Sequence, residues 1–319
     1  MKLRTLGRTE LAVSEIGFGC GPTGGLMING SAAERREAVA CALDLGINYF
    51  DTAAVYGAGV SETHLGEALR ELGARARVAV ATKVALAPGD LRDIVGAVQR
   101  SVEDSLRRLG LGELALIQLH NRIGLERAAR APFGTGALLA SADVAGPDGV
   151  LEAFERLRAR GLVRHLGCSA FGGDMSMVRN LIDSDRVEVL ALHYSILNRT
   201  AWSGHEGAAV LDYAQVGRRA ASKHMGTVAL RVLEGGALAE VGAAAHRDPA
   251  TCTAAARLAE TLDRAGTDPA EGAIRFVLSN PEVGVVLVGF SDIREIREAA
   301  CYSNRGPLDR NLLNLIEGI

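Results

Sequence analysis

Four residues of this chain have side chains suited to proton transfer, and three of them occupy the same kind of position. Asp51 follows the apolar run INYF, Lys83 follows VAVAT and His120 follows LALIQL, while Tyr56 lies shortly after Asp51. In a parallel α/β chain the carboxyl ends of the strands meet at one mouth, where chemistry collects. We therefore expect these four side chains to converge, although they are far apart in the sequence.

Together the four residues can move a proton to or from a carbonyl oxygen. A phenol has a pKa near ~10 and is a poor acid at neutral pH unless a cation lies beside it. Lys83 can supply that cation, Asp51 can keep the lysine protonated, and His120 can donate a hydrogen bond to a substrate oxygen. The set suits reduction of a carbonyl by hydride, or the reverse oxidation, and it needs no metal. Each residue alone could instead be structural.

Lysine is rare in this chain, which sets Lys83 apart. Lys2, Lys83 and Lys223 are the three lysines among 35 basic residues, and all the others are arginines. Lysine is a compact point charge that tunes a neighbour's pKa, whereas the planar arginine is hard to bury in a tight site. A lysine at the end of an apolar strand therefore indicates a chemical role, whereas Lys2 and Lys223 are expected on the surface.

The elements that must position these residues alternate along the chain. Short apolar segments rich in Val, Ile, Leu and Ala alternate with segments of helical periodicity, and such near-continuous apolar runs are typical of strands buried on both faces. The expected strands are IGFG, NYFD, RVAVATKV, LALIQLH, LVRHLGCS, VEVLALHY, GTVAL and VGVVLVG. The expected helices cover residues 31–45, 61–72, 90–109, 152–160, 174–182, 207–224, 249–265, 269–278, 292–300 and 309–319.

Eight such strand–helix units favour a closed parallel barrel over an open sheet. The sequence thus predicts an α/β fold, a (β/α)8 TIM barrel, with residues 1–319 in a single domain because no change of composition marks a boundary. Residues 1–15 precede the first unit and are expected to form a β-hairpin that acts as a lid over one barrel end.

Three predicted loops are longer than the usual connections of such a barrel. They cover residues 121–150, 195–206 and 231–247, and all leave the mouth that carries the four polar residues. Long loops at this end usually form the substrate pocket. Trp202 is either an aromatic wall for the ligand or an ordinary packing residue. The first loop is rich in Ala and Gly and could be mobile filler, and the apolar character of the loops argues against a strongly charged substrate.

Composition excludes several classes of partner. A net charge of −3 gives no electrostatic basis for binding nucleic acid or an anionic membrane. No apolar run approaches the ~18 residues of a membrane helix, and the charged N-terminus is not a signal peptide. The five cysteines are scattered and form no CxxC pair, which favours reduced thiols in a cytoplasmic protein. We expect a monomer or small homo-oligomer acting on a small carbonyl or alcohol compound.

Several motifs together resemble the aldo-keto reductase superfamily. They are FDTAAVYG followed by SETHLGEAL, then ATKV, LIQLHN, GCSAFG and GFSDIREIREAA, and they span nearly the whole chain. The resemblance implies an (α/β)8 barrel that binds NAD or NADP across the carboxyl-end mouth. It further implies that Tyr56 is the general acid and base, that Lys83 and Asp51 tune it, and that His120 places the carbonyl.

The resemblance also implies cofactor-binding positions, some of which depart from the family pattern. Ser169 matches a family serine, but Ala170 replaces its asparagine partner and Ala191 stands where a glutamine is expected. Leu230 replaces an aromatic residue that stacks on the nicotinamide, and Arg231 is expected at the pyrophosphate. The other positions assigned to the cofactor are Gly19, Cys20, Asp51, Tyr194, Leu233, Gly289, Phe290, Ser291, Glu295 and Glu298.

The last motif bears on the choice of cofactor. Gly289 and Glu295 occupy places where NADP-binding members often carry Lys and Arg. A carboxylate repels a 2′-phosphate and can accept a hydrogen bond from a free ribose hydroxyl, which favours NAD. Arg294 and Arg297 keep NADP open, because a shift of one residue would place an arginine there.

Three functions are compatible with these residues. The first is an NAD(P)-dependent oxidoreductase that interconverts a carbonyl and an alcohol. RVLEGGAL and VLVGFSD resemble the sugar 1-dehydrogenase and pyridoxal branches, so an oxidative role on an aldose is the second. A non-catalytic, cofactor-binding regulatory subunit is the third.

Overall fold

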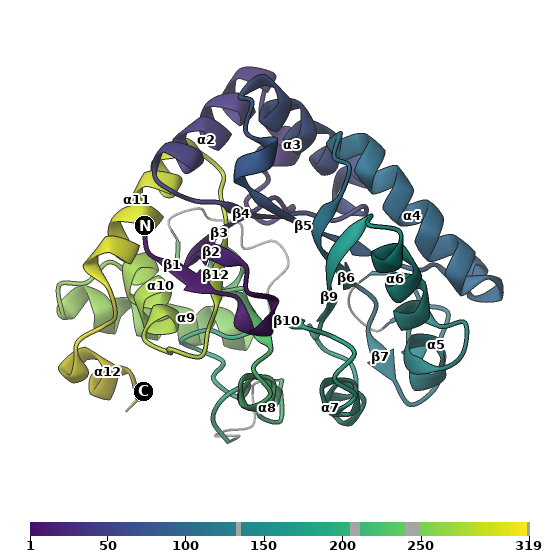
Figure 1. The fold of residues 1–319 in the computed structure, drawn as a ribbon. Coiled ribbons are helices and arrows are strands. Elements are labelled where there is room, and N and C mark those ends of the chain that lie inside the picture. Colours follow the sequence, from purple (N-terminus) through teal and green to yellow (C-terminus); the bar gives the residue numbers. More distant parts are fainter. Residues whose placement is uncertain (132–134, 205–210, 240–248, 318–319) are drawn as a thin grey trace.

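The centre of the molecule is a closed barrel of eight parallel strands, shown in Figure 1. The computed structural model describes residues 1–131, 135–204, 211–239 and 249–317. Each barrel strand pairs with the next one along the chain, and the last pairs with the first. The strands are β3 (Ile16–Gly19), β4 (Tyr49–Asp51), β5 (Ala79–Val84), β6 (Leu114–Leu119), β9 (Val163–Ser169), β10 (Val189–His193), β11 (Gly226–Leu230) and β12 (Val285–Gly289).

Helices surround this barrel, so the predicted (β/α)8 fold is confirmed. That residues 1–319 form one domain stays a prediction. The helices are α1 (Leu26–Asn29), α2 (Ala32–Asp44), α3 (Val60–Glu71), α4 (Ile94–Leu109), α5 (Ser141–Ala145), α6 (Val150–Ala159), α7 (Met175–Asp183), α8 (Val216–Ser222), α9 (Pro249–Arg264), α10 (Pro269–Leu278), α11 (Ile293–Arg305) and α12 (Arg310–Glu317).

Side-chain caps explain where several of the helices begin. At α2 the Ser31 hydroxyl accepts a hydrogen bond from the Glu34 amide, and the Glu34 carboxylate accepts one from the Ser31 amide at 2.7 Å. This capping box satisfies amides that have no partner within the helix. The start predicted for α4 was wrong. Residues Pro88–Arg92 form a separate 3₁₀ turn, and Asp93, with φ of −148°, caps a helix that begins at Ile94 rather than Asp90.

Two predicted segments, one helix and one loop, differ from expectation. The helix expected over 207–224 is reduced to α8, because Ala214 and Gln215 adopt positive φ values of 48° and 57° just before it; residues 205–210 lie outside the described part. The loop over 121–150 holds β7 (Ile123–Gly124), β8 (Leu139–Ala140) and α5, and an ion pair joins Arg127 to Asp143. The described residues of this loop therefore include regular secondary structure, unlike the mobile segment considered from the sequence.

The hairpin of β1 (Leu3–Thr5) and β2 (Ala12–Ser14) closes the amino-terminal end of the barrel, as predicted for a lid. Leu6, in the turn between the two strands, is completely buried in a cluster with residues that point into the barrel, such as Tyr49 and Leu116. A Cβ on Gly226 or Gly284 would lie 2.7 or 2.9 Å from the Leu6 side chain, so the absence of side chains there makes room for it. The opposite end is left for the site.

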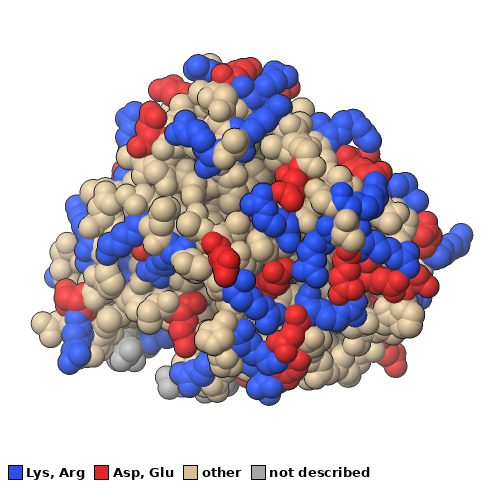
Figure 2. Space-filling view, in the orientation of Figure 1, with Lys and Arg blue, Asp and Glu red and all other residues tan. Residues whose placement is uncertain are grey.

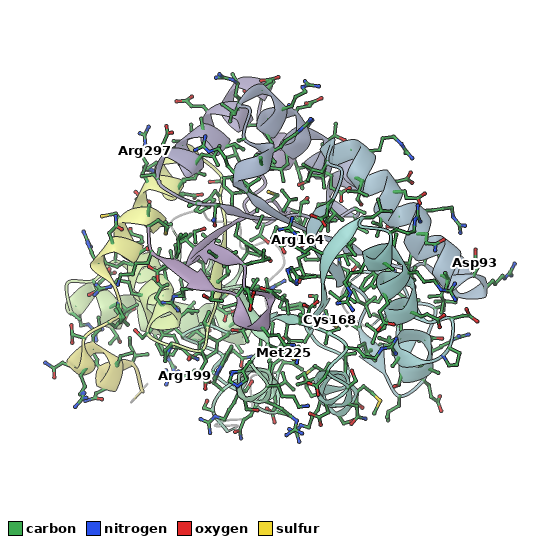
Figure 3. The ribbon with its side chains drawn as sticks, viewed as in Figure 1. Asp93, Arg164, Cys168, Arg199, Met225 and Arg297 are labelled. Carbon is green, nitrogen blue, oxygen red and sulfur yellow. The ribbon has the colours of Figure 1, made fainter. Side chains whose placement is uncertain are left out.

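The outer surface carries charges of both signs. On the face shown in Figure 2, basic and acidic side chains are interspersed, and they form no extended basic area. Figure 3 shows Cys168 and Met225 near the barrel, where both are buried, whereas Asp93 and Arg297 lie at the periphery. Among the helices that the structure describes, none combines the length and the apolar character needed to span a bilayer.

Leu6→Ala is expected to lower the free energy of unfolding by about 2–5 kcal/mol, because it empties a site that the barrel wall cannot collapse to fill. Leu3→Ala, at a position of the same hairpin that is 59% exposed, should change it by less than about 0.5 kcal/mol. Urea denaturation of both variants checks this. Equal, small losses would show that Leu6 does not close the barrel.

Candidate active site

Asp51, Tyr56, Lys83 and His120 line one cavity at the carboxyl ends of the barrel strands. Asp51 is the last residue of β4, Lys83 the penultimate residue of β5, and His120 directly follows β6. Parallel pairing of β4 with β5 and of β5 with β6 brings these strand ends together. The convergence expected from the strand ends is therefore present.

Lys83 is the centre of a buried hydrogen-bond network. Its Nζ donates to an Asp51 carboxylate oxygen and, at 2.8 Å, to the Thr52 carbonyl, and it lies 3.4 Å from the Tyr56 hydroxyl. Gln118 donates to the second Asp51 oxygen at 2.9 Å. Burial opposes the charge of Lys83, but the Asp51 carboxylate and Tyr56 together outweigh it, so the pKa of Lys83 lies above its usual value. The lysine therefore stays a cation.

Tyr56 is held over this cation by a tight turn. It begins a 3₁₀ turn, Tyr56–Gly59, in which Gly57, Ala58 and Gly59 all have positive φ. A Cβ at Gly59 would lie 2.8 Å from the Arg108 side chain, so glycine is needed for the close approach. Burial raises the pKa of Tyr56 above its usual value, and the nearby charge of Lys83 acts in the opposite direction. The lysine thus limits the rise that burial causes.

His120 lies edge-on to Tyr56, with the ring centroids 5.7 Å apart. Burial, followed by the charge of Lys83, lowers the pKa of His120 to about 3. The imidazole is therefore neutral near pH 7, and a neutral imidazole has one N–H that can donate to an oxygen. Its Nδ1 is buried and has no hydrogen-bond partner among the described residues. This ring is thus suited to orienting a substrate oxygen rather than to carrying charge.

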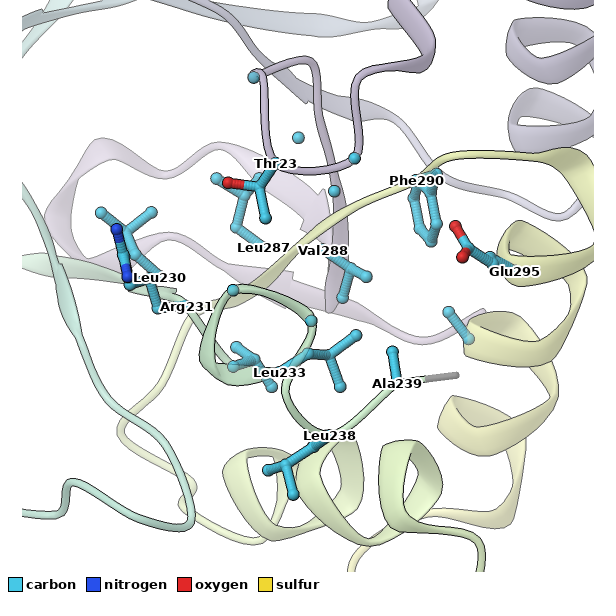
Figure 4. A pocket seen from close by; sticks show the side chains of 18 of the residues that line it. Thr23, Leu230, Arg231, Leu233, Leu238, Ala239, Leu287, Val288, Phe290 and Glu295 are labelled. Carbon is cyan, nitrogen blue, oxygen red and sulfur yellow. The ribbon is translucent and has the colours of Figure 1, made fainter. Parts of the chain in front are cut away.

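The cavity extends from these residues to α11 and has a volume of about 640 Å³. Figure 4 shows Arg231 at one side and Glu295 at the other, with Thr23 and Leu233 between them. Of the positions assigned to the cofactor from sequence, those that line the cavity are Gly19, Asp51, Ser169, Leu230, Arg231, Leu233, Gly289, Phe290, Ser291, Glu295 and Glu298.

A family model described as "Aldo/keto reductase family" matches residues 15–319. The chain belongs to the aldo/keto reductase family. The superfamily resemblance seen in the sequence motifs is thereby confirmed, and so is the prediction of an oxidoreductase.

Relatives of this aldo-keto reductase that match over nine-tenths or more of the chain have modest sequence identity to it. An L-galactose dehydrogenase from Arabidopsis thaliana is 28% identical, covering 100% of this chain and 94% of that protein. A pyridoxal 4-dehydrogenase from Microbacterium luteolum is 28% identical, covering 92% of this chain and 91% of that protein. Among solved structures, the holo form of aldo-keto reductase AKR11C1 from Bacillus halodurans superposes with a TM-score of 0.75 at 24% identity, covering 100% and 96% of the two chains. This last likeness shows the shared fold.

Three residues assigned to the cofactor lie outside the cavity wall of this aldo-keto reductase. Cys20 is buried, and its thiol approaches the Phe18 carbonyl. Ala170 is buried and is not among the residues that line the cavity. The Tyr194 ring packs against Trp202, with the centroids 4.4 Å apart. Trp202 itself donates a hydrogen bond to Glu282 at 2.7 Å and is not among the residues that line the cavity, so of its two interpretations the packing residue is the one that the structure supports.

Other residues of the site were not found from the sequence. Gln118 holds Asp51, and its signal was a single amide within the apolar run LALIQL. Arg122 and Phe171 line the cavity close to His120 and Ser169 in the sequence. Their signal was proximity to motif residues, since Arg122 follows LIQLHN and Phe171 lies within GCSAFG. Neither is part of a periodic pattern, so nothing in the sequence indicated that they face the same space.

The depressed pKa of His120 predicts a pH dependence of stability. An unfolded histidine titrates near its ordinary value of 6.5, whereas the folded one stays neutral down to about pH 3. Between these values the unfolded chain binds one more proton, so the free energy of unfolding falls as pH falls, by up to about 1.4 kcal/mol per pH unit. His120→Gln should show a shallower decrease in urea denaturation between about pH 7 and about pH 5. Identical slopes in the two proteins would contradict the neutral, buried His120.

Proposed function

We propose that this chain is an NAD(P)-dependent oxidoreductase that interconverts a small carbonyl compound and the corresponding alcohol, with Tyr56 as the general acid and base. The observation that carries the proposal is the contact between the Tyr56 hydroxyl and Lys83, whose charge is kept by Asp51. A cation beside a phenol stabilises the phenolate that remains after proton transfer, and here it offsets part of the rise in the pKa of Tyr56 that burial causes. The assignment agrees with the family and with the dehydrogenase names of its relatives.

The cavity lining is compatible with a nicotinamide dinucleotide. The loop from Gly19 to Gly24 presents backbone to the cavity, and a Cβ at Gly24 would overlap the Phe290 backbone nitrogen. The wall beyond it is apolar, with Leu230 and Leu233 among its residues, and a volume of about 640 Å³ is typical of a ligand site. Such a cofactor supplies or accepts the hydride, while the protein supplies position and electrostatics.

In the direction of reduction, the protein's own groups act on the substrate oxygen. The Tyr56 hydroxyl and the neutral His120 ring both line the cavity and can donate hydrogen bonds to one carbonyl oxygen, which polarises the carbon. As hydride forms the new C–H bond, the electron pair of the C=O bond moves to oxygen, and Tyr56 delivers its proton there. Lys83 stabilises the remaining phenolate. In oxidation Tyr56 takes the hydroxyl proton instead, so the same groups serve both directions.

We propose NAD as the preferred cofactor. At the far side of the cavity the Glu295 carboxylate accepts hydrogen bonds from the Ser291 amide and hydroxyl at 2.6 and 2.9 Å. The carboxylate has no ion-pair partner among the described residues, so its charge opposes a 2′-phosphate. Arg294 lines the cavity too, but it lies 3.7 Å from Asp292, which partly compensates its charge. NADP remains the alternative.

Oxidation of a sugar or related alcohol is the second candidate. The names of two full-length relatives, L-galactose dehydrogenase and pyridoxal 4-dehydrogenase, both describe oxidative enzymes, which favours this direction. The regulatory-subunit hypothesis is less well supported, because all four groups needed for proton transfer face the cavity. A cytoplasmic location and a monomeric or small homo-oligomeric state stay predictions.

Tyr56→Phe should reduce turnover of an aldehyde or alcohol by about 10²- to 10⁴-fold, because it removes the proton donor. Tyr49→Phe is a matched control: its hydroxyl is buried without a hydrogen-bond partner among the described residues, and Tyr49 belongs to the closed end of the barrel. Steady-state kinetics with NADH measures both, and fluorescence titration checks that Tyr56→Phe still binds the cofactor. Full activity of Tyr56→Phe, or no turnover by the parent protein, would contradict the proposal.

Glu295→Gln should weaken the preference for NADH over NADPH by roughly tenfold, which corresponds to about 1.4 kcal/mol, because it removes the charge that opposes the 2′-phosphate. Glu103→Gln, on the surface of α4, should leave the preference unchanged. Titration of both cofactors at the same salt concentration provides the two dissociation constants. Tighter NADPH binding by the parent protein would show that an arginine, rather than Glu295, faces the ribose.

A further inference from the structure

Two arginines form the wall of the cavity near the catalytic groups, and both contact the same aromatic ring. The Arg231 guanidinium carbon lies 4.8 Å from the Phe171 centroid, and that of Arg122 lies 5.5 Å from it. Arg122 is only 7% exposed and comes two residues after His120, whereas Arg231 directly follows β11. Cation–π contacts with one ring therefore hold two positive charges in the same part of the cavity.

Among the described residues, two carboxylates near this pair, Asp51 and Glu234, accept hydrogen bonds from other groups. Asp51 is bound by Lys83 and Gln118. Glu234 lies close enough to Arg231 for the two charges to interact, but it accepts hydrogen bonds from His193, at 2.9 Å, and from Ser195. Besides Asp51, the described acidic residues that line the cavity are Asp268, Glu295 and Glu298, which belong to the cap of α10 and to α11. Among the residues that the structure describes, two arginines therefore face one carboxylate, Glu234, on this side of the cavity, and Figure 4 shows Arg231 on the side opposite Glu295.

Holding this arrangement is costly for the folded chain. Arg231 adopts a φ of 55°, in the left-handed region that residues other than glycine rarely occupy. Burial lowers the pKa of Arg122, and the neighbouring charge of Arg231 lowers it further. Strain and like-charge repulsion of this kind persist mainly where a site requires them, and a bound anion would relieve the repulsion.

We propose that Arg122 and Arg231 form a subsite for a carboxylate of the substrate, so that the natural substrate is an oxo acid or hydroxy acid rather than a neutral aldehyde or sugar. The inference rests on the proposed carbonyl–alcohol chemistry and specifies its substrate class. A guanidinium offers a planar fork of N–H donors that matches a carboxylate, and two forks fixed in advance lose little conformational freedom on binding. The subsite reverses the expectation, drawn from the alanine-rich loops, that the substrate is not strongly charged.

The same arginines offer a competing interpretation that the test must separate. Arg231 was assigned from sequence to the cofactor pyrophosphate, which is also an anion. Arg122 has no such assignment, and it shares the Phe171 ring with Arg231. If the substrate carboxylate is the ligand, both arginines must affect substrate selectivity. If the pyrophosphate is the ligand of Arg231, that residue must affect cofactor affinity instead.

The experiment compares pairs of aldehydes that differ by one carboxylate. The pairs are 4-oxobutanoate with butanal and 4-carboxybenzaldehyde with benzaldehyde, because a flexible and a rigid acid differ in reach. The measured quantity is the ratio of kcat/KM for the acid to kcat/KM for its neutral partner, at saturating NADH. We expect the parent protein to favour an acid by about tenfold or more, and Arg122→Gln and Arg231→Gln each to lower that ratio by about tenfold, mainly through KM.

Arg164→Gln is the matched control. Arg164 lies on β9 near its amino-terminal end, is 53% exposed and pairs with Glu113, so its loss should leave the ratio unchanged. Benzoate binding in the presence of NAD, followed by calorimetry, gives a readout that does not depend on turnover. Weaker benzoate binding by both cavity variants, but not by Arg164→Gln, supports the subsite even if none of the four aldehydes is reduced. In that case the proposed reaction fails while the anion subsite stands.

Two results would overturn the inference. If the parent protein reduces acids and neutral aldehydes equally well and does not bind benzoate, the proposed reaction stands but the carboxylate subsite does not exist. If Arg231→Gln weakens NADH binding while both variants keep the selectivity ratio of the parent, the arginine belongs to the cofactor.

Discussion

The buried ion pair between Lys83 and Asp51 is the interaction on which the site depends. Both side chains are about 2% exposed, and taking two charges out of water is costly unless good geometry and further hydrogen bonds compensate. Here the Thr52 carbonyl and the Gln118 amide supply those bonds. The charge that Lys83 keeps is also the one that acts on Tyr56 and His120. After burial, the charge of Lys83 is thus the largest influence on the pKa of each of the other two groups.

The barrel makes this pair possible because strand register determines which side chains meet. Lys83 lies opposite Gln118 in the pairing of β5 with β6, and Asp51 lies opposite Ala81 in the pairing of β4 with β5. A small alanine beside the carboxylate leaves room for the longer lysine and glutamine. The glycine turn that follows β4 then brings the Tyr56 ring to within 5.0 Å of the Lys83 amine. Positions within strands and one tight turn therefore build the site, and the long loops add the walls around it.

The sequence allowed prediction of the strands and helices, which have a repeating pattern, and of the polar residues that stand at the ends of strands. Apolar runs and caps such as Ser31 with Glu34 were enough for the barrel and most helices, and strand ends identified Asp51, Lys83 and His120. Local backbone geometry was not accessible in this way, as the positive φ values before α8 show. Nor were contacts between distant segments: Phe171 meets Arg122 and Arg231 only because β6, β9 and β11 end at the same mouth. The role of Trp202 stayed open between a ligand wall and a packing residue because its position in a loop did not reveal that its ring packs on Tyr194.

The burial of Leu6 at the closed end of the barrel has a consequence for the order in which the protein folds. Leu6 is synthesised well before Gly226 and Gly284, so its contacts with them cannot form until those later segments have been made. The pairing of β3 with β12, from Ile16 to Val286, has the same long separation along the chain. Contacts of such separation require closure of a long loop, which slows their formation. The hairpin must therefore wait with an apolar residue uncovered, and the final closure of the barrel joins an early segment of the chain to one that is made much later.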